Sequence, residues 1–223
     1  MTISADMLCM RMQTNFENLS VIRDQALASS NSTFNVHDHL KGMSVENLQE
    51  ISGRDRLPWH TACLNVTGDL NVGTMIRTSH CLGASSVLIF GRQRIDNRSL
   101  VGSANYIRVE KIKDDWSDSC PARFVQELAC RRLTPVLVEL GGQPLHKINW
   151  TIRSEAITNR GNQICLVMGN ETGGIPPEFF DACLTMPNSF TVSIPQRGVI
   201  RSMNVAVAHA IIAGSMCAAL NWF

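Results

Sequence analysis

Three polar stretches of this sequence combine residue types that could hold a polar ligand. They span residues 65–80, 168–178 and 193–210. Glycine lets a ligand approach the backbone, the planar fork of arginine pairs with phosphate or carboxylate, and Ser, Asn and Glu supply donors and acceptors. Neither GxxxxGK[ST] nor GxGxxG occurs, which argues against a P-loop and against a standard dinucleotide fingerprint.

In the first stretch, Asn71 stands just before an expected helix and Arg77 follows six residues later, nearly two turns along. Asn71 could cap this helix, while Arg77 could lie on the surface or point into a cleft. A capping Asn and a surface Arg are the more common explanation, so this pair alone does not define a site.

The second stretch, MGNETGGIPPE, follows the apolar run 163–168. Its glycines permit positive φ and close approach of a ligand, and its two prolines stiffen the entry to the next helix. The alternative is a tight strand-to-helix turn. Because such a turn needs no Asn170, Glu171 and Thr172 between its glycines, we favour a ligand-binding loop.

In the third stretch a strand ends and a polar loop with Arg197 and Arg201 follows. Ser202 and Asn204 then open a helical segment that contains no Asp, Glu, Lys or Arg after Arg201. Ser202 could be a helix cap and nothing more. Beside two arginines, however, Ser-x-Asn also offers donors and acceptors where a ligand would dock.

Alternating strands and helices are expected around these loops, which is typical of an α/β domain with a mainly parallel sheet. Each loop follows a strand, and ligands of such folds bind beyond the carboxyl ends of strands. The patterns predict strands at 61–66, 86–90, 106–110, 135–140, 163–168 and 190–194, and helices at 72–82, 121–133, 177–183 and 203–220. Residues 5–30 and 44–52 have helical spacing and form an N-terminal extension of residues 1–57.

The composition of the 223 residues, 44% hydrophobic and 17% charged, suffices for one core and a small appendage. A net charge of +1 excludes a global field that attracts nucleic acid or an anionic membrane, so any polyanion site must be local. Residues 71–113 are such a basic segment, although a solvated polar face explains it equally well. Its basic residues are Arg77, Arg92, Arg94, Arg98, Arg108, Lys111 and Lys113, against Asp96 and Glu110.

The eight cysteines form no CxxC pair, so we expect reduced, buried thiols of a cytosolic protein, and the N-terminus has no signal-peptide pattern. The pair His37 and His39 lacks a third ligand for a metal. Residues 202–223 are long enough to span a bilayer, but Asn204 and His209 would need partners in lipid. A helix buried in a core or in a subunit interface is the better interpretation.

Taken in order, three motifs closely resemble those of the SpoU (TrmH-like) RNA ribose 2'-O-methyltransferases of the SPOUT class. They are Asn71-x-Gly-x-x-x-Arg77, Gly169-Asn-Glu171-x-Gly, and Ile194-Pro-x-x-Gly-x-x-x-Ser202-Met-Asn204-Val. The resemblance covers roughly residues 58–220, and it departs mildly at Met203, where Leu is usual. It implies a methyltransferase domain at 58–223 with a mainly parallel sheet flanked by helices and a C-terminal deep trefoil knot. It also implies an active site at a homodimer interface.

The resemblance further implies S-adenosylmethionine as the cofactor and no metal. Arg77 would bind the RNA phosphate and activate the ribose 2'-hydroxyl, since arginine is a poor free base at its normal pKa. The other catalytic positions, which would hold Arg77, the cofactor and the ribose in register, are Asn71, Glu171, Ser202 and Asn204. The cofactor would lie against Met168, Gly169, Asn170, Gly173, Gly174, Ile194, Pro195, Ser202, Met203 and Asn204.

The expected partner is RNA in the cytoplasm, with no membrane. The N-terminal extension is short for the ribosomal-protein-like domain that several rRNA-modifying members carry, and the form IPQRGVIRSMNV resembles some members that act on tRNA guanosine. Both features favour tRNA as the substrate. Ribosomal RNA is the alternative substrate. A non-catalytic RNA-binding protein of the same fold is the alternative outside enzymes, although the intact motif residues argue against it.

Overall fold

The computed structural model describes residues 35–91, 95–112 and 120–223. Contacts divide the chain into two compact units, residues 1–48 and 49–223. In the first unit, η1 (Asp38–Leu40) precedes α2 (Val45–Arg54), which starts in this unit and confirms the helix expected at 44–52. The helical spacing at 5–30 lies outside the described residues. The proposed extension 1–57 and domain 58–223 therefore stay predictions.

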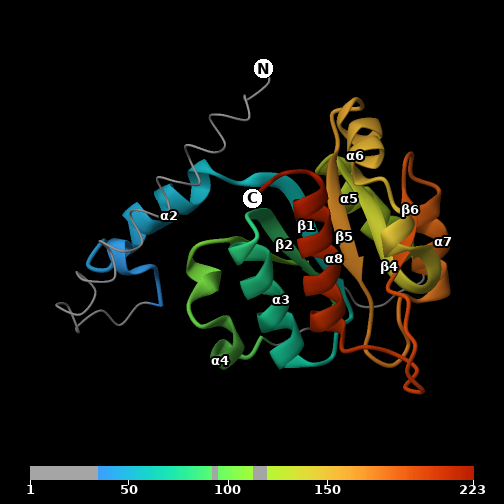
Figure 1. The fold of residues 1–223 in the computed structure, drawn as a ribbon, viewed down its shortest axis with the longest axis horizontal. Helices are drawn as coiled ribbons and strands as arrows, with labels where there is room; N and C mark the ends of the chain where they lie inside the picture. Colours follow the sequence, from blue (N-terminus) through green and yellow to red (C-terminus); the bar gives the residue numbers. More distant parts are fainter. Residues whose placement is uncertain (1–34, 92–94, 113–119) are drawn as a thin grey trace. The chain divides into compact units, whose positions relative to one another are not determined.

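The second unit contains a six-stranded sheet in which every strand pair is parallel, in the order β3-β2-β1-β5-β4-β6 (Figure 1). The central strands are almost continuously apolar, as strands covered on both faces must be. This confirms the expected α/β fold. The strands are β1 (Leu57–Leu64), β2 (Ala84–Phe90), β3 (Arg108–Ile112), β4 (Leu133–Pro144), β5 (Gln163–Met168) and β6 (Phe190–Ser193).

Helices cover both faces of the sheet and create two cores. One core lies under α3 (Asp69–Cys81), α6 (Trp150–Thr158) and α8 (Val205–Ala219), with Trp59 and Cys63 of β1. The other lies under α5 (Cys120–Cys130) and α7 (Pro177–Leu184), with Ala62 and Leu64 of β1. Successive β1 residues thus point to opposite faces. Short turns of helix complete the unit: α4 (Asn97–Leu100), η2 (Ser103–Asn105) and η3 (Leu145–Lys147).

The sequence patterns missed α6 and ended β4 four residues too early. Only Trp150 and Ile157 of α6 are buried, so its apolar spacing is weak. β4 continues through Gly142, where an added Cβ would lie 2.9 Å from the backbone of Val192 in β6. Glycine here marks a close approach of two strands, not the end of one.

The uncharged C-terminal segment contains α8, which buries one face in the core as expected and leaves Val207 and Ile211 exposed. His209 of α8 is fully buried, with Nε2 2.9 Å from Oγ1 of Thr61, and burial lowers its pKa to about 4. His209 is therefore neutral near pH 7. Among the described residues, no helix is long and apolar enough to cross a membrane.

The expectation of buried thiols is only partly met. Six described cysteines are free, and two of these, Cys81 and Cys130, are exposed at the ends of α3 and α5. Helix ends face solvent more readily than the strands that hold Cys63 and Cys165. The family's trefoil knot stays a prediction.

Candidate functional site

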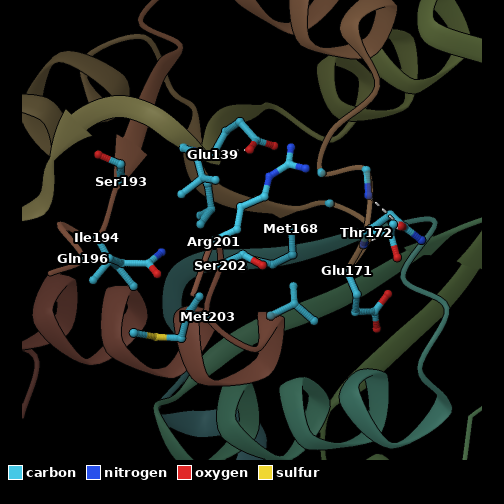
Figure 2. A pocket seen from close by; sticks show the side chains of 18 residues that line it. Glu139, Met168, Glu171, Thr172, Ser193, Ile194, Gln196, Arg201, Ser202 and Met203 are labelled. Carbon is cyan, nitrogen blue, oxygen red and sulfur yellow. Dashed lines mark hydrogen bonds between the residues drawn. The ribbon is translucent and has the colours of Figure 1, made fainter. Parts of the chain in front are cut away.

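The loops that follow β1, β5 and β6 meet at one edge of the sheet. Because the strands are parallel, their carboxyl ends share this edge, which is where ligands bind in such folds. A cavity of about 140 Å³ opens there (Figure 2). It is lined by Val138, Glu139, Leu140, Met168, Gly169, Asn170, Glu171, Thr172, Gly173, Gly174, Ser193, Ile194, Gln196, Arg201, Ser202, Met203, Val205 and Ala208.

The glycines of residues 169–174 let this loop fold back on itself. The backbones of Asn170 and Gly174 exchange two hydrogen bonds of 2.9 Å, and Gly174 has a φ of +67°. A Cβ at Gly169 would lie 2.4 Å from the carbonyl carbon of Gly174. Oδ1 of Asn170 also accepts from the N–H groups of Thr172 and Gly173. Residue 169 must therefore be glycine for the loop to fold back in this way. The folded loop forms a wall of the cavity.

Glu139, which sequence reasoning missed, ties this loop to β4. Its Oε2 accepts a hydrogen bond of 2.9 Å from the N–H of Ile175, and its Oε1 accepts one of 2.9 Å from the N–H of Leu140. A charged residue directly after the apolar run 135–138, near the carboxyl end of a predicted strand, was the available signal.

Glu171 joins the second stretch to the first. Oε2 accepts from the N–H and Oγ1 of Thr67 at 2.9 and 2.8 Å, while Oε1 accepts from the N–H of Gly68 at 2.9 Å and Nδ2 of Asn71 at 2.7 Å. Partial burial alone would raise the pKa of Glu171. The donors, led by Asn71, outweigh it and lower the pKa to about 2. The carboxylate is therefore ionised and held on both oxygens.

Asn204 joins the third stretch to the same network. Its Nδ2 donates to Oδ1 of Asn71 at 3.0 Å, and its Oδ1 accepts from the N–H groups of Ala206 and Val207 at the start of α8. Asn204, rather than Ser202, is the cap of α8. Asn71 does not cap α3 either, because that cap position is Gly68. The amide of Asn71 instead connects Glu171 with Asn204.

Most of the expected site residues line this cavity, and the others lie outside it. Ser202 lines the cavity, as do all the expected cofactor residues except Pro195 and Asn204. Arg77 does not line it: this residue is exposed on α3 and makes no hydrogen bond or ion pair with a described residue. Asn71 and Asn204 face a second, open cavity of about 400 Å³ between α3 and α8, lined also by Thr74, Thr78, Ala206, Val207, Ala210 and Ile211.

We expect Glu171→Gln to destabilise the fold. The amide keeps one acceptor oxygen and turns a donor toward N–H groups, which should lower the free energy of unfolding by about 1–2 kcal/mol near pH 7. Because the folded pKa lies below the ordinary value of 4.5, the contribution of the carboxylate is complete above about pH 4.5 and is lost as the pH falls toward 2. Urea unfolding at several pH values measures both effects.

Glu155→Gln is the matched control, since Glu155 is an exposed carboxylate on α6. It should leave stability unchanged. Equal stability of Glu171→Gln and the wild type at pH 7 would contradict a structural role for the Glu171 network.

Comparison with known proteins identifies the family of this chain. A model of the SpoU rRNA Methylase family matches residues 59–214. The structure is similar to a TrmH/SpoU tRNA modifying enzyme of A. aeolicus, with a TM-score of 0.59 and 19% identity over 79% of this chain and 82% of that chain. No curated protein matches the chain.

Two similar structures contain S-adenosylmethionine. The SpoU methyltransferase AviRb of Streptomyces viridochromogenes, in complex with AdoMet, has a TM-score of 0.55 and 23% identity over 73% of this chain and 57% of that chain. An AdoMet-bound rRNA methyltransferase of Sinorhizobium meliloti has a TM-score of 0.57 and 23% identity over 78% and 60%.

The parallel sheet with a cavity at the carboxyl ends of its strands is thus an α/β domain whose fold is similar to that of the TrmH/SpoU tRNA modifying enzyme. The family model covers more than half of the residues, and the chain belongs to the SpoU rRNA methylase family of RNA methyltransferases.

Proposed function

We propose that this protein is an S-adenosylmethionine-dependent RNA 2'-O-ribose methyltransferase that acts on tRNA guanosine in the cytoplasm. The observation that carries the proposal is the hydrogen-bonded chain Glu171–Asn71–Asn204, which joins all three motif stretches beside the cavity. One similar structure is that of an RNA 2'-O ribose methyltransferase, at 16% identity and a TM-score of 0.54. The similarity to the tRNA modifying enzyme favours tRNA, while the family description and AdoMet-bound S. meliloti structure keep rRNA as the alternative.

The cavity has the chemical surfaces that S-adenosylmethionine requires. Apolar side chains suit an adenine ring, and Glu139, Arg201 and the polar loop suit the ribose and the charged amino acid part. Bound there, the cofactor would supply a methyl group on a cationic sulfur. The apolar lining residues are Val138, Leu140, Met168, Ile194, Met203, Val205 and Ala208.

Arg77 does not line the cofactor cavity of its own chain, so it would have to approach the methyl group from outside that cavity. It is exposed, it has no partner among the described residues, and it lies on α3 beside Thr74 and Thr78 of the second cavity. A second copy of the chain, docked on the groove between α3 and α8, would bring its Arg77 to the cavity of the first. There the guanidinium would hold the RNA phosphate and polarise the 2'-hydroxyl in line with the methyl group.

We expect the protein to be a homodimer that pairs through this groove. Val207 and Ile211 of α8 are 49% and 39% exposed, although they are apolar and adjacent on the helix. Ile211→Glu should place a charge in the interface and give a monomer of 24.6 kDa in light scattering, where the wild type gives twice that mass.

The control for this prediction is Ile152→Glu, because Ile152 is a 62% exposed isoleucine on α6. This variant should remain dimeric. A monomeric wild type at micromolar concentration would overturn the dimer and the proposed position of Arg77.

The function is tested by incubating the protein with S-adenosylmethionine, labelled in the methyl group, and with separated tRNA and rRNA. Label should enter tRNA, and nuclease mapping should locate it as 2'-O-methylguanosine. Label in rRNA alone would select the alternative substrate. Calorimetric binding of the cofactor with no transfer to either RNA would favour the non-catalytic RNA-binding protein.

A further inference from the structure

Three ionisable side chains line the cavity, two acids and one base: Glu139, Glu171 and Arg201. They come from the ends of β4 and β5 and from the loop before α8. Figure 2 shows Arg201 extending into the cavity toward Glu139, with Glu171 on the other side of the loop. The cavity is therefore lined by opposite charges at separate positions.

Both acids already have partners, whereas Arg201 has none among the described residues. Glu171 accepts four hydrogen bonds from Thr67, Gly68 and Asn71, and Glu139 accepts two from backbone N–H groups. Neither carboxylate forms an ion pair with Arg201 in the described part of the chain. The guanidinium is thus a cation at the cavity with free donors, a state that favours binding of an anion.

We infer that Arg201 is the residue that recognises the α-carboxylate of the cofactor's amino acid part. This inference rests on the proposed function, because it takes S-adenosylmethionine to be the ligand. The cofactor carries one anionic group, the α-carboxylate, and two cationic groups, the ammonium and the sulfonium. Arg201 is the cation that the described residues place at the cavity, while Glu139 and Glu171 already accept hydrogen bonds from the protein. A planar guanidinium binds a carboxylate through two parallel N–H donors, which gives direction as well as charge.

Arg197 provides a natural comparison within the same loop. It is also an exposed arginine, four residues before Arg201, but it does not line the cavity. Arg201 should therefore contribute to cofactor affinity, whereas Arg197 should not.

The test is calorimetric binding of S-adenosylmethionine and of its decarboxylated analogue, which lacks only the carboxylate. The wild type should prefer the complete cofactor by about tenfold to a hundredfold, the range of a hydrogen-bonded charge pair. Arg201→Gln should weaken binding of the complete cofactor by a similar factor and leave binding of the analogue unchanged. Arg201→Lys, which keeps the charge without the fork, should retain part of the preference. Arg197→Gln should bind both ligands as the wild type does.

Several outcomes overturn the inference while leaving the proposed function intact. One is an unchanged affinity of Arg201→Gln for the complete cofactor. Another is an equal loss for both ligands, which would mean that Arg201 shapes the cavity rather than binding the carboxylate. A third is loss of RNA binding with unaltered cofactor binding, which would assign Arg201 to RNA phosphate. No binding of S-adenosylmethionine by the wild type would overturn the proposed function and this inference together.

Discussion

Replacing Arg77 with Ala should abolish methyl transfer and leave both the melting temperature and cofactor binding near those of the wild type. The side chain is exposed and makes no hydrogen bond or ion pair with a described residue, so its removal costs the fold little. Arg77→Lys should also fail, because an ammonium keeps the charge and loses the planar fork. Methyl transfer to tRNA, normalised to folded protein, measures the effect. Substantial activity in Arg77→Ala would contradict the proposed role of Arg77 in methyl transfer.

Mixing two inactive variants tests whether Arg77 acts on the partner's cavity. Arg77→Ala keeps a functional cavity, and a variant without a functional cavity keeps Arg77. After subunit exchange, one of the two sites in each mixed dimer combines a good cavity with a good arginine, and roughly a quarter of wild-type activity should return. If Arg77 served the cavity of its own chain, the mixture would stay inactive.

The variant for that mixture is Gly169→Val, which should abolish cofactor binding. Its Cβ would lie 2.4 to 2.6 Å from backbone atoms of Gly174 and Ile175. Backbone atoms cannot move aside as a flexible side-chain end can, so residues 169–174 would have to leave the path that lines the cavity. Calorimetry should show no heat from S-adenosylmethionine, and the cofactor should no longer raise the melting temperature.

Gly198→Ala is the control for Gly169→Val. A Cβ at Gly198 meets no atom within 4 Å, and its φ does not lie in the left-handed region. This variant should bind the cofactor with unchanged affinity. Far-UV circular dichroism of Gly169→Val should retain the wild-type spectrum, since the strain is confined to a loop. Wild-type cofactor affinity in Gly169→Val would place the binding site elsewhere.

The fold class could be predicted because the strands that decide it are buried on both faces and therefore mostly apolar. β5 was predicted with its exact ends for this reason. α6 could not be found in the same way, because only two of its residues enter the core. The end of β4 was also missed, since Gly141 and Gly142 are typical of turns, and only the close approach of Val192 explains Gly142 as part of a strand.

The residue types of the candidate site could be predicted from the sequence, but the hydrogen bonds between these residues could not. Motif spacing selected Asn71, Glu171 and Asn204, and the structure brings these three side chains together. Asn204 caps α8 through local bonds, but its hydrogen bond to Asn71 joins side chains 133 residues apart, which no local pattern contains. Arg201 was noted in the third stretch but not assigned to the site, because it occupies an unspecified position of the motif, and Glu139 lies outside the motifs. Both residues line the cavity.

The residues that contact one another in and near the site lie far apart in the sequence. This separation also determines when the site can form during synthesis. Thr67 and Glu171 are 104 residues apart, Asn71 and Asn204 are 133 apart, and Thr61 and His209 are 148 apart. At about 5–20 residues per second, a ribosome therefore leaves β1 and α3 without these partners for several seconds. Until α8 emerges, the apolar face of α3 and the hydroxyl of Thr61 lack their final cover, and a chaperone has its longest opportunity to bind. The nascent chain can acquire its cavity only after α8 has emerged.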